Sequence, residues 1–539
     1  MTDKIHIAVL AEVCRLKGIR HVVLSPGSRS APLVIAFSQN NAFKTHVIVD
    51  ERVAGFTALG LAQQTSQTVA IICTSGTALL NLAPAVCEAF HQQVPLLLLT
   101  ADRPKEFIGI GENQAINQFE IFKNYSKAFF ELPENVNEAA QLSAQAIHLS
   151  QHPFCGPVHL NIPLREPLYN QIETALPAFN WKETSMAEPH RFTLPEFGKT
   201  LIVCGLQHPD AELQKHLGEI AATGKAVVIA EPVSNLHHPD FIQNPDLLLS
   251  HALPLNHLLP DTVITIGKQF VSKRLRQFLR KAAVPFHFHI SMDEGKWNGI
   301  GAKHFQHIFS DVVTVIKEMA SGNTTDFHFA ELWKRERQKS WQQHSKALAG
   351  APFSDLKLFE KLVNALPKNS SLQYGNSSPI RYAGLFAHPE SVSVFSNRGT
   401  SGIDGCLSTA VGAAIARPNR LTFCVIGDVS FFYDSNALWN HELPKNLRIV
   451  LINNGGGNIF ELIEGPQSVS GFEKYFSTRH QLNARHLAAM YTLPYWCCNN
   501  MNEWDEQWPK LLQSGSCSIL EVKTDPEVNR EVWRNYFLN

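Results

Sequence analysis

Residues 421–454 have the sequence LTFCVIGDVSFFYDSNALWNHELPKNLRIVLINN, in which two apolar segments flank a helical stretch. The apolar segments, 421–426 and 447–452, are rich in Val, Ile and Leu, as expected for strands buried on both faces of a parallel sheet. A right-handed crossover would place two such strands in the same sheet. The stretch therefore predicts an α/β unit, and ligands bind to such sheets at the carboxyl ends of the strands.

Hard oxygen ligands follow both predicted strands. Gly427 and Asp428 follow the first strand, and Asn453, Asn454 and the glycines 455–457 follow the second. A carboxylate, an amide oxygen and a glycine carbonyl suit Mg²⁺, which leaves positions open for phosphate oxygens and water. Two ordinary βα loops would also contain Asp and Asn, as N-caps and turn formers. The spacing alone leaves both interpretations open.

The same alternation of apolar runs and helical stretches extends along the chain, which at 539 residues is too long for one core. We expect an α/β fold of three consecutive α/β domains with mainly parallel sheets. The expected domains are 1–180, 190–345 and 355–539, with a linker over 169–195 and a polar surface helix over 324–354 that runs into a second linker. The other expected strands are 21–24, 47–49, 69–73, 96–100, 158–160, 201–204, 226–230, 263–266 and 518–522.

Composition excludes several classes of function. The formal net charge of -1 provides no global field for nucleic acid or an anionic membrane. The 10 cysteines form no CxxC pair, so they indicate neither a zinc framework nor a disulfide ladder, and they fit a reducing compartment. Residues 1–20 space their apolar side chains like an amphipathic helix, and no apolar run approaches the roughly 20 residues that a membrane span needs. We expect a soluble, cytoplasmic protein without a membrane span.

An arginine follows the first predicted strand. The segment from Leu24 to Ser30 runs from that strand through a tight turn into a helix, which Ser28 or Ser30 would cap. Arg29 in the first turn opposes the helix dipole unless a bound carboxylate or phosphate compensates. An exposed arginine paired with a nearby acid would explain this residue equally well.

Two acids, Asp50 and Glu51, follow the predicted buried strand 47–49 and open a helix over 53–64. Acids are common in a first helical turn, and local sequence favours that explanation. A glutamate just beyond a buried strand could instead hydrogen-bond a heterocycle nitrogen and change its proton affinity.

Other arginines occur singly in loops that are rich in glycine and hydroxyl residues. Arg103 follows the strand 96–100, Arg381 ends the segment GNSSPIR, and Arg398 lies in SNRGTSGIDG. Such loops favour bound anions, and isolated arginines in a near-neutral chain indicate a small polyanion as ligand.

Two further segments carry weaker signals. The basic run from Lys273 to Lys281 is typical of a solvated helix face. The segment GIGENQ, residues 109–114, lacks the third glycine and the preceding strand of a dinucleotide fingerprint.

Taken together, these segments resemble the thiamine diphosphate enzymes of the decarboxylase and acetolactate synthase type, in which a Gly-Asp pair and a later Asn-Asn pair mark the diphosphate and Mg²⁺ site. The segments SPGSRSAPL, DER, TSGTALLNLAPAV, TADRP, NQAI, SKRL, GNSSPIR and SNRGTSGIDG are similar, in the same order, to segments of the members that join 2-oxoglutarate to isochorismate in menaquinone biosynthesis. The resemblance covers nearly the whole chain. It implies pyrimidine-binding, central and diphosphate-binding domains at the three expected positions.

The resemblance implies thiamine diphosphate and Mg²⁺ as cofactors, with Mn²⁺ as an alternative ion. Glu51 resembles the glutamate that hydrogen-bonds N1′ of the aminopyrimidine and so promotes loss of the C2 proton. The other implied cofactor residues are Gly427, Ile403 as an apolar prop, and the metal ligands Asp428, Asn454 and Gly456.

Two dicarboxylate substrates would explain the arginine loops. Ser377, Arg381 and Arg398 resemble the group that holds 2-oxoglutarate. The implied isochorismate residues are Ser28, Arg29, Arg103, Asn113, Gln114, Lys273 and Arg274. The resemblance implies catalytic roles for Glu51, Arg29, Gln114, Ser377, Arg381 and Arg398.

The implied reaction is decarboxylation of 2-oxoglutarate, followed by conjugate addition of the succinyl carbanion equivalent to isochorismate. Members of the family form the site between the first domain of one subunit and the third domain of another, so we expect a homodimer or homotetramer. Val429 and Gly455 depart from the family pattern, and residues 480–483 fit it only loosely. The rival hypotheses are another thiamine diphosphate-dependent 2-oxoacid decarboxylase or acetolactate-type synthase, and a non-catalytic binding protein on the same scaffold.

Overall fold

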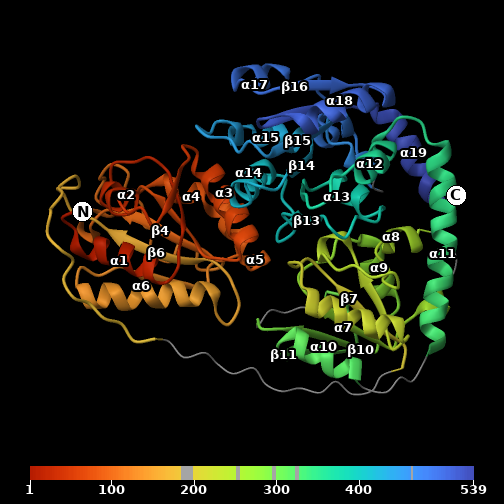
Figure 1. Ribbon diagram of the computed structural model, residues 1–539, viewed down its shortest axis with the longest axis horizontal. Coiled ribbons are helices and arrows are strands. Elements are labelled where there is room, and N and C mark those ends of the chain that lie inside the picture. Colours follow the sequence, from red (N-terminus) through yellow and green to blue (C-terminus); the bar gives the residue numbers. More distant parts are fainter. Residues whose placement is uncertain (184–197, 251–254, 294–298, 322–326, 463–464, 539) are drawn as a thin grey trace.

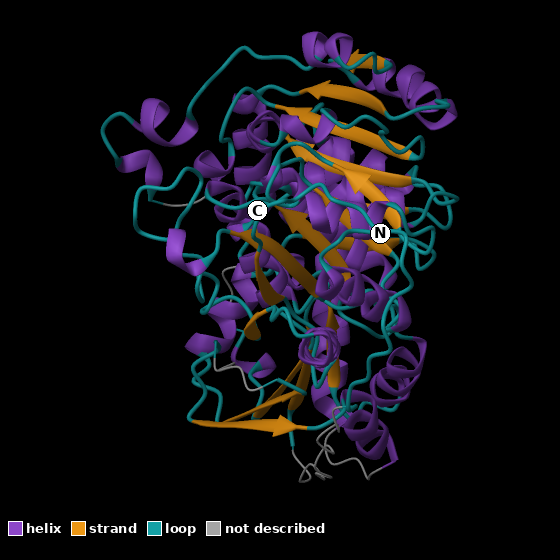
Figure 2. Ribbon diagram, turned by 90° about the vertical axis from the view of Figure 1, so that its left-hand side faces the viewer, coloured by secondary structure: helices purple, strands orange, loops and turns teal. Residues whose placement is uncertain are grey.

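The computed structural model describes residues 1–539 except 184–197, 251–254, 294–298, 322–326, 463–464 and 539 (Figure 1). Three β-sheets follow one another along the chain, and all strand pairs within them are parallel. Helices pack around the sheets (Figure 2). The predicted α/β fold is confirmed. The domain boundaries stay predictions, and residue 190 and part of the linker 169–195 lie outside the described residues.

The first sheet has six strands in the order β2-β1-β3-β4-β6-β5. Its strands are β1 (His21–Leu24), β2 (Lys44–Val47), β3 (Val69–Cys73), β4 (Leu96–Asp102), β5 (Ala128–Glu131) and β6 (Val158–Pro163). The helices of this domain are α1 (Ile5–Leu16), α2 (Ala31–Ser38), α3 (Glu51–Thr65), α4 (Thr77–Asn81), α5 (Ala83–Gln92) and α6 (Val136–Gln151). The central strands β3 and β4 are buried along their whole length, which explains their nearly continuous apolar sequences.

The strand predicted over 47–49 is wrong in position and in burial. β2 ends at Val47, and as the edge strand of its sheet it is largely exposed. The chain then leads to Asp50, whose carboxylate caps α3 by accepting hydrogen bonds from the N–H groups of Arg52 and Val53. Glu51 is the first residue of that helix.

The second sheet has five strands in the order β11-β10-β9-β7-β8. Its strands are β7 (Thr200–Cys204), β8 (Val227–Ala230), β9 (Thr262–Ile266), β10 (Phe286–Ser291) and β11 (His304–Phe309), and its helices are α7 (Ala211–Ala222), α8 (Pro245–Leu248), α9 (Lys273–Lys281) and α10 (Val312–Ser321). The long helix α11 (Phe327–Gly350) runs along the side of the molecule from this domain to the third (Figure 1). It corresponds to the helix predicted over 324–354, of which residues 324–326 lie outside the described ranges.

The third sheet has six strands in the order β13-β12-β14-β15-β17-β16. Its strands are β12 (Ser371–Tyr374), β13 (Ser393–Ser396), β14 (Thr422–Gly427), β15 (Leu447–Asn453), β16 (Tyr495–Cys498) and β17 (Ser518–Lys523). Its helices are α12 (Asp355–Asn364), α13 (Ser378–Ala383), α14 (Cys406–Ala416), α15 (Asp428–Tyr433), α16 (Ile459–Leu462), α17 (Arg485–Met490), α18 (Met501–Gln513) and α19 (Pro526–Leu538). β14 and β15 are neighbours, as the crossover predicts.

The first and third domains share one hydrophobic core where α3 crosses α14. A Cβ on Gly60 would lie 2.0 Å from the carbonyl oxygen of Thr409, and one on Gly412 would lie 2.0 Å from that of Thr57. Glycine is required for so close a contact. The helix that begins with Glu51 is therefore fixed against the domain that contains the Gly-Asp and Asn-Asn segments.

The N-terminal segment forms α1, as its apolar spacing predicts. Among the helices of the described ranges, none combines the length and the apolar character that crossing a membrane requires.

Candidate active site

A cavity of about 140 Å³ lies at the carboxyl ends of β12, β14 and β15. These ends meet because the three strands are neighbours in one parallel sheet. The sequence-predicted residues that line the cavity are Ser377, Ile403, Gly427, Asp428, Asn454 and Gly456. The fold therefore gathers the residues predicted for the metal ion and the diphosphate at one place, and Glu51 is not among the lining residues.

Asp428 joins the two motif loops. It is buried, and its Oδ2 accepts hydrogen bonds from the backbone N–H groups of Gly455 (2.8 Å) and Gly456 (3.0 Å). Burial raises the pKa of the Asp428 carboxyl, whereas these hydrogen bonds and a protonated His480, whose Nε2 lies 3.5 Å away, act in the opposite direction. A bound cation would stabilise the ionised carboxylate further.

Asn454 is oriented by a residue that the sequence did not single out. Its Nδ2 donates to Oδ2 of Asp355 (3.0 Å), so its amide oxygen is the atom left for a metal ion. Asp355 also accepts a hydrogen bond from the hydroxyl of Thr524 (2.6 Å), and burial raises the pKa of its carboxyl to about 6. Partners of this kind fix the orientation of metal ligands. Asp355 lies in no recognisable motif, so its role could not be predicted from the sequence.

The glycine loop after Asn454 can supply a backbone carbonyl group as a metal ligand. Gly456 has a φ of +146°, and a Cβ at this position would lie 2.5 Å from the carbonyl oxygen of Ser477. Any other residue would be strained there. A carboxylate, an amide oxygen and an adjacent glycine loop match the donors that Mg²⁺ prefers.

One residue in the cavity wall has unsatisfied polar atoms. Asn458 is 4 % exposed, and within the described residues neither its Nδ2 nor its Oδ1 has a hydrogen-bond partner. Leaving such a buried group unpaired costs about 1–3 kcal/mol. A buried amide of this kind indicates a ligand that offers both acceptors and donors, as a diphosphate with metal-bound water does. The wall therefore fits thiamine diphosphate and Mg²⁺.

Ser377 and its neighbour Asn376 connect two of the predicted anion loops. Ser377 precedes α13 with a φ of +74°, an uncommon conformation for a residue with a side chain. Nδ2 of Asn376 donates to the carbonyl oxygens of Asn397 and Gly402 (2.6 Å each), and its Oδ1 accepts from Nη1 of Arg398 (3.2 Å). The sequence GNSSPIR predicted an anion-binding loop here, but it did not predict that Asn376 links this loop to the loop of Arg398.

Three of the predicted arginines, Arg274, Arg381 and Arg398, gather where the central and third domains meet. Asp246 interacts electrostatically with Arg274 and Arg381, and Glu231 interacts with Arg398. Burial lowers the pKa of Arg381 and of Arg398, and these acids partly offset the effect. The three arginines therefore lie among acids rather than free in solvent.

The basic run at the start of α9 is only partly the solvated face that its composition predicts. Lys273 is exposed, but Arg274 stacks on the ring of Phe537, with its guanidinium carbon 4.2 Å from the ring centroid. Arg276 lies 4.9 Å from the ring centroid of Phe270 and donates to the carbonyl oxygen of that residue (3.2 Å). The prediction is wrong for Arg276, because its side chain turns inward against the domain.

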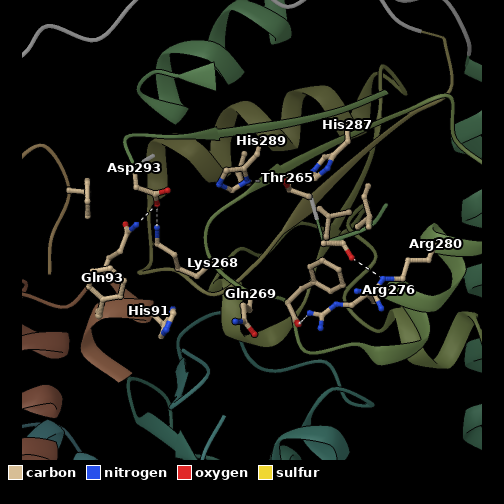
Figure 3. Close-up of a pocket in the computed structure, with 17 residues that line it drawn as sticks. His91, Gln93, Thr265, Lys268, Gln269, Arg276, Arg280, His287, His289 and Asp293 are labelled. Atoms are coloured by element: carbon tan, nitrogen blue, oxygen red, sulfur yellow. Dashed lines mark hydrogen bonds and ion pairs between the residues drawn. The ribbon is translucent and has the colours of Figure 1, made fainter. Parts of the chain in front are cut away.

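A second cavity, of about 640 Å³, lies between the first and central domains and contains none of the predicted site residues (Figure 3). His91 and Gln93 of the first domain border it on one side, and Gln269, Arg276 and Arg280 of the central domain on the other (Figure 3). Cavity volume alone would therefore have pointed away from the residues that the motifs identify.

The predicted first-domain arginines lie at the carboxyl edge of the first sheet. Arg29 is buried, and its guanidinium donates to the carbonyl oxygen of Leu164 (2.9 Å) and pairs with Glu166 (3.2 Å). Arg103 donates to the carbonyl oxygen of Asn113 (2.8 Å). Neither arginine lines the cavity that contains Asp428.

The neighbouring polar residues lie at the same edge. Ser28 is exposed, and the carbonyl oxygen of Gln114 accepts a hydrogen bond from the hydroxyl of Ser75 (2.9 Å). Ser30 occupies the N-cap position of α2, but its hydroxyl donates to the carbonyl oxygen of Gly27 (3.0 Å). Neither serine side chain caps α2, so the predicted capping by Ser28 or Ser30 is wrong.

Glu51 lies beside the third domain but outside the cavity that Asp428 lines. Burial raises the pKa of its carboxyl. The residues next to it bind the end of α15 and the turn after it: Arg52 donates to the carbonyl oxygen of Tyr433 (3.0 Å), and Asn436 of the turn Ser435–Leu438 donates to Asp50 (2.8 Å). The structure thus brings together the metal and diphosphate residues, but not Glu51, within one chain.

Comparisons with known proteins define the class. Residues 7–121 match the family described as "Thiamine pyrophosphate enzyme, N-terminal TPP binding domain", and residues 379–522 match "Thiamine pyrophosphate enzyme, C-terminal TPP binding domain". The three parallel sheets and the cavity with hard oxygen donors agree with these matches, and the chain is a thiamine pyrophosphate enzyme.

Curated relatives narrow the class to one family. The chain is 41 % identical to a protein of Flavobacterium psychrophilum, over 98 % of both chains, and 40 % identical to one of Flavobacterium johnsoniae, over 98 % of this chain and 97 % of that protein. It is 36 % identical to a protein of Desulfotalea psychrophila, over 98 % of this chain and 99 % of that protein. All three are named 2-succinyl-5-enolpyruvyl-6-hydroxy-3-cyclohexene-1-carboxylate (SEPHCHC) synthase. The chain belongs to the SEPHCHC synthase family of thiamine pyrophosphate-dependent transferases, and the resemblance inferred from its motifs is confirmed.

Proposed function

We propose that the protein decarboxylates 2-oxoglutarate and adds the succinyl carbanion equivalent to isochorismate, giving SEPHCHC and CO₂ in menaquinone biosynthesis. The names of the curated relatives support this reaction. The observation that carries the proposal is one cavity lined by Asp428, Asn454 and Ser377, next to the helix α13 that bears Arg381 and the loop that bears Arg398.

Thiamine diphosphate and Mg²⁺ are the proposed cofactors, with Mn²⁺ as an alternative ion. Asp428, Asn454 and the carbonyl group of Gly456 would hold the ion, and the amide of Asn458 would bond the diphosphate. Gly427 and Ile403 complete the proposed cofactor set. When bound, the cofactor supplies the nucleophile and the electron sink for decarboxylation.

Ser377, Arg381 and Arg398 would bind and orient 2-oxoglutarate. Guanidinium groups pair with carboxylates through two parallel hydrogen bonds, which fixes direction as well as position. Nε of Arg398 is buried without a partner in the described part of the chain, which supports a role in holding an anion. Correct orientation of bound reactants accounts for a large share of the rate in such reactions.

The proposed isochorismate residues come from the first and central domains. Nε of Arg29 and Nε of Arg103 are buried and unpartnered within the described residues, although Arg52 and Arg448 share this property. The complete proposed set is Ser28, Arg29, Arg103, Asn113, Gln114, Lys273 and Arg274.

A homodimer or homotetramer would complete the site, with Glu51 of the partner subunit reaching N1′ of the aminopyrimidine. Burial raises the pKa of Glu51, which favours the protonated carboxyl that such a hydrogen bond requires. Val47 and Val49, just before Glu51, and Tyr433 and Trp439, after Asp428, are large exposed apolar side chains. Exposed apolar residues around an incomplete site support association with a second copy.

We also propose a cytoplasmic location. All ten cysteines are free thiols, which is in line with a reducing compartment.

The proposed function is tested by measuring CO₂ release from 2-oxoglutarate and from pyruvate, with thiamine diphosphate and Mg²⁺ present. We expect clear preference for 2-oxoglutarate, because a pyruvate enzyme would have less need of Arg381 and Arg398. Preference for pyruvate would favour the rival decarboxylase or acetolactate-type synthase. Absence of cofactor binding in a calorimetric titration would favour a non-catalytic binding protein.

A further inference from the structure

Glu88 of α5 is a buried carboxylate, 1 % exposed, that has no part in the reaction proposed above. Its hydrogen-bond donors include two residues of the third domain. Oε1 accepts from the N–H group of Gly399 (2.7 Å), and Oε2 accepts from the N–H group and the hydroxyl of Thr400 (2.6 Å each). Both residues directly follow Arg398, so a first-domain carboxylate binds the loop that carries this arginine.

The other side of the loop is bound by a neighbour of Glu88. Nε2 of Gln92 donates to Oε1 of Glu88 (2.5 Å) and to the carbonyl oxygen of Ser396 (3.3 Å). Gln63 donates to Gln92 (3.1 Å), and Gln373 of β12 donates to Gln63 (2.9 Å). These hydrogen bonds form a chain of buried side chains that ends at Gln373 in the third domain. The loop is therefore held both before and after Arg398.

The geometry of the loop leaves little freedom. A Cβ on Gly399 would lie 2.7 Å from the backbone oxygen of Glu88, so the two domains are in direct backbone contact there. From the opposite side, Nε2 of Gln269 donates to the carbonyl oxygen of Gly399 (3.1 Å). Figure 3 shows Gln269 on the central domain, at the border of the large cavity. The loop is clamped between the two other domains.

The carboxylate of Glu88 binds backbone N–H groups of the loop rather than the side chain of Arg398. No hydrogen bond or ion pair joins Glu88 to the guanidinium of Arg398 within the described residues, and that guanidinium donates to Oδ1 of Asn376 instead. A carboxylate that binds successive N–H groups fixes a loop strongly, because charge-assisted hydrogen bonds are the stronger ones. Toward Arg398 itself, Glu88 exerts only a longer-range electrostatic attraction, which raises the pKa of the guanidinium.

We propose that Glu88 is a positioning residue for substrate binding: it holds residues 396–400 through their backbone, so that Arg398 presents its guanidinium to a substrate carboxylate. The proposal rests on the proposed role of Arg398 toward 2-oxoglutarate. Glutamine at this position would face the N–H groups of Gly399 and Thr400 with at least one donor in place of an acceptor, so the loop would move.

The test compares Glu88→Gln with the wild-type enzyme by hydrogen–deuterium exchange of the segment 396–405 and by steady-state kinetics. We expect faster exchange in that segment and a 2-oxoglutarate KM that rises about 10- to 100-fold, the range for one lost charge-assisted hydrogen bond. The isochorismate KM should change less. Ser150→Ala, which removes a buried hydroxyl elsewhere in the first domain, is the matched control and should alter neither quantity.

A double-mutant cycle separates positioning from general destabilisation. If Glu88 acts through Arg398, Glu88→Gln has little further effect on the 2-oxoglutarate KM in an Arg398→Met background. Independent effects of the two substitutions, or unchanged exchange of 396–405 in Glu88→Gln, would overturn the proposal. If Glu88→Gln does not fold, Thr400→Val removes one of the bonds to Glu88, and unchanged exchange in that variant would overturn it. A wild-type enzyme that does not use 2-oxoglutarate would reject the proposed function, while the exchange experiment would still decide the role of Glu88.

Discussion

The side-chain amide of Asn454 donates to the carboxylate of Asp355 at 3.0 Å, across 99 positions of sequence. This contact ties the loop after β15 to the first residue of α12. A proposed metal ligand therefore takes its orientation from a residue outside every motif, and the quality of the metal site depends on how the whole third domain folds.

Asp355→Ala should weaken Mg²⁺ binding in the presence of thiamine diphosphate by about 10- to 100-fold, as loss of an orienting partner typically does. The Asn454 amide would then be free to rotate. Calorimetric titration of Mg²⁺ measures the change. Thr524→Val is the control, because it removes a different hydrogen bond to the Asp355 carboxylate and leaves the bond to Asn454 in place. Equal losses in the two variants would mean that Asp355 supports the fold rather than the ligand.

Asn458→Leu should separate stability from cofactor binding. It removes two unsatisfied buried polar atoms, so the Tm of the cofactor-free protein should stay the same or rise. The affinity for thiamine diphosphate should fall about 10-fold or more, because a hydrogen bond to a charged group is lost. Thermal unfolding with and without thiamine diphosphate and Mg²⁺ provides both values. A lower Tm without cofactor, together with an unchanged cofactor-induced shift, would contradict the assignment.

Glu51→Gln should keep the fold and reduce kcat by about 10²- to 10⁴-fold, the range for loss of a group that assists proton transfer. Asp428→Ala should lose Mg²⁺ and cofactor affinity. If each site combines Glu51 of one subunit with Asp428 of the other, coexpression of the two variants should restore activity. Half of the dimers would be mixed, with one intact site each, so about a quarter of wild-type activity is expected.

The coexpression experiment can also show that one chain supplies both Glu51 and Asp428 to a site. No recovery, with mixed dimers demonstrated by native mass spectrometry, would mean that Glu51 and Asp428 of the same chain form the site. Near-normal turnover of Glu51→Gln alone would remove Glu51 from its proposed role.

His388 should contribute to loss of stability in acid. It is buried, with Nε2 2.9 Å from the hydroxyl of Tyr374 and Nδ1 3.1 Å from the carbonyl oxygen of Phe386, and burial lowers its pKa from 6.5 to about 4. The unfolded chain therefore binds more protons between these values, and stability that is present above pH 6.5 is lost as the pH falls toward 4. His388→Gln should remove about 2 kcal/mol of the decrease in unfolding free energy between pH 7 and pH 5. Urea unfolding at both pH values measures this, and an equal decrease in both proteins would contradict the assignment.

The apolar strands were predictable because strands buried on both faces consist almost entirely of apolar residues. β1 and β3 have the predicted bounds, β14 is shifted by one residue at both ends, and β15 is one residue longer at its C-terminal end. β10 and β11 were missed because histidine and other polar residues interrupt the apolar residues of their sequences, FHFHIS and HFQHIF. Two of these histidines, His287 and His289, lie 2.8 Å from the hydroxyl of Thr265 in β9, a contact that only the assembled sheet provides.

The site residues also divide into those that local sequence predicts and those that only the folded structure reveals. The metal and diphosphate residues lie in short local motifs at strand ends, and parallel pairing brings them together. Asp355 and Glu88 could not be predicted, because each acts on a loop far along the chain through a hydrogen bond that no local pattern encodes. The burial of Arg276 depends in the same way on Phe270 and the packing of α9.

The most direct measurement of the central claim is a reaction of the purified enzyme with 2-oxoglutarate, isochorismate, thiamine diphosphate and Mg²⁺, followed by mass spectrometry. We predict a product with the mass of SEPHCHC and one CO₂ for each product formed, and no such product when 2-oxoglutarate or isochorismate is omitted. A cofactor-loaded enzyme that released CO₂ from pyruvate and left 2-oxoglutarate and isochorismate unchanged would contradict the account.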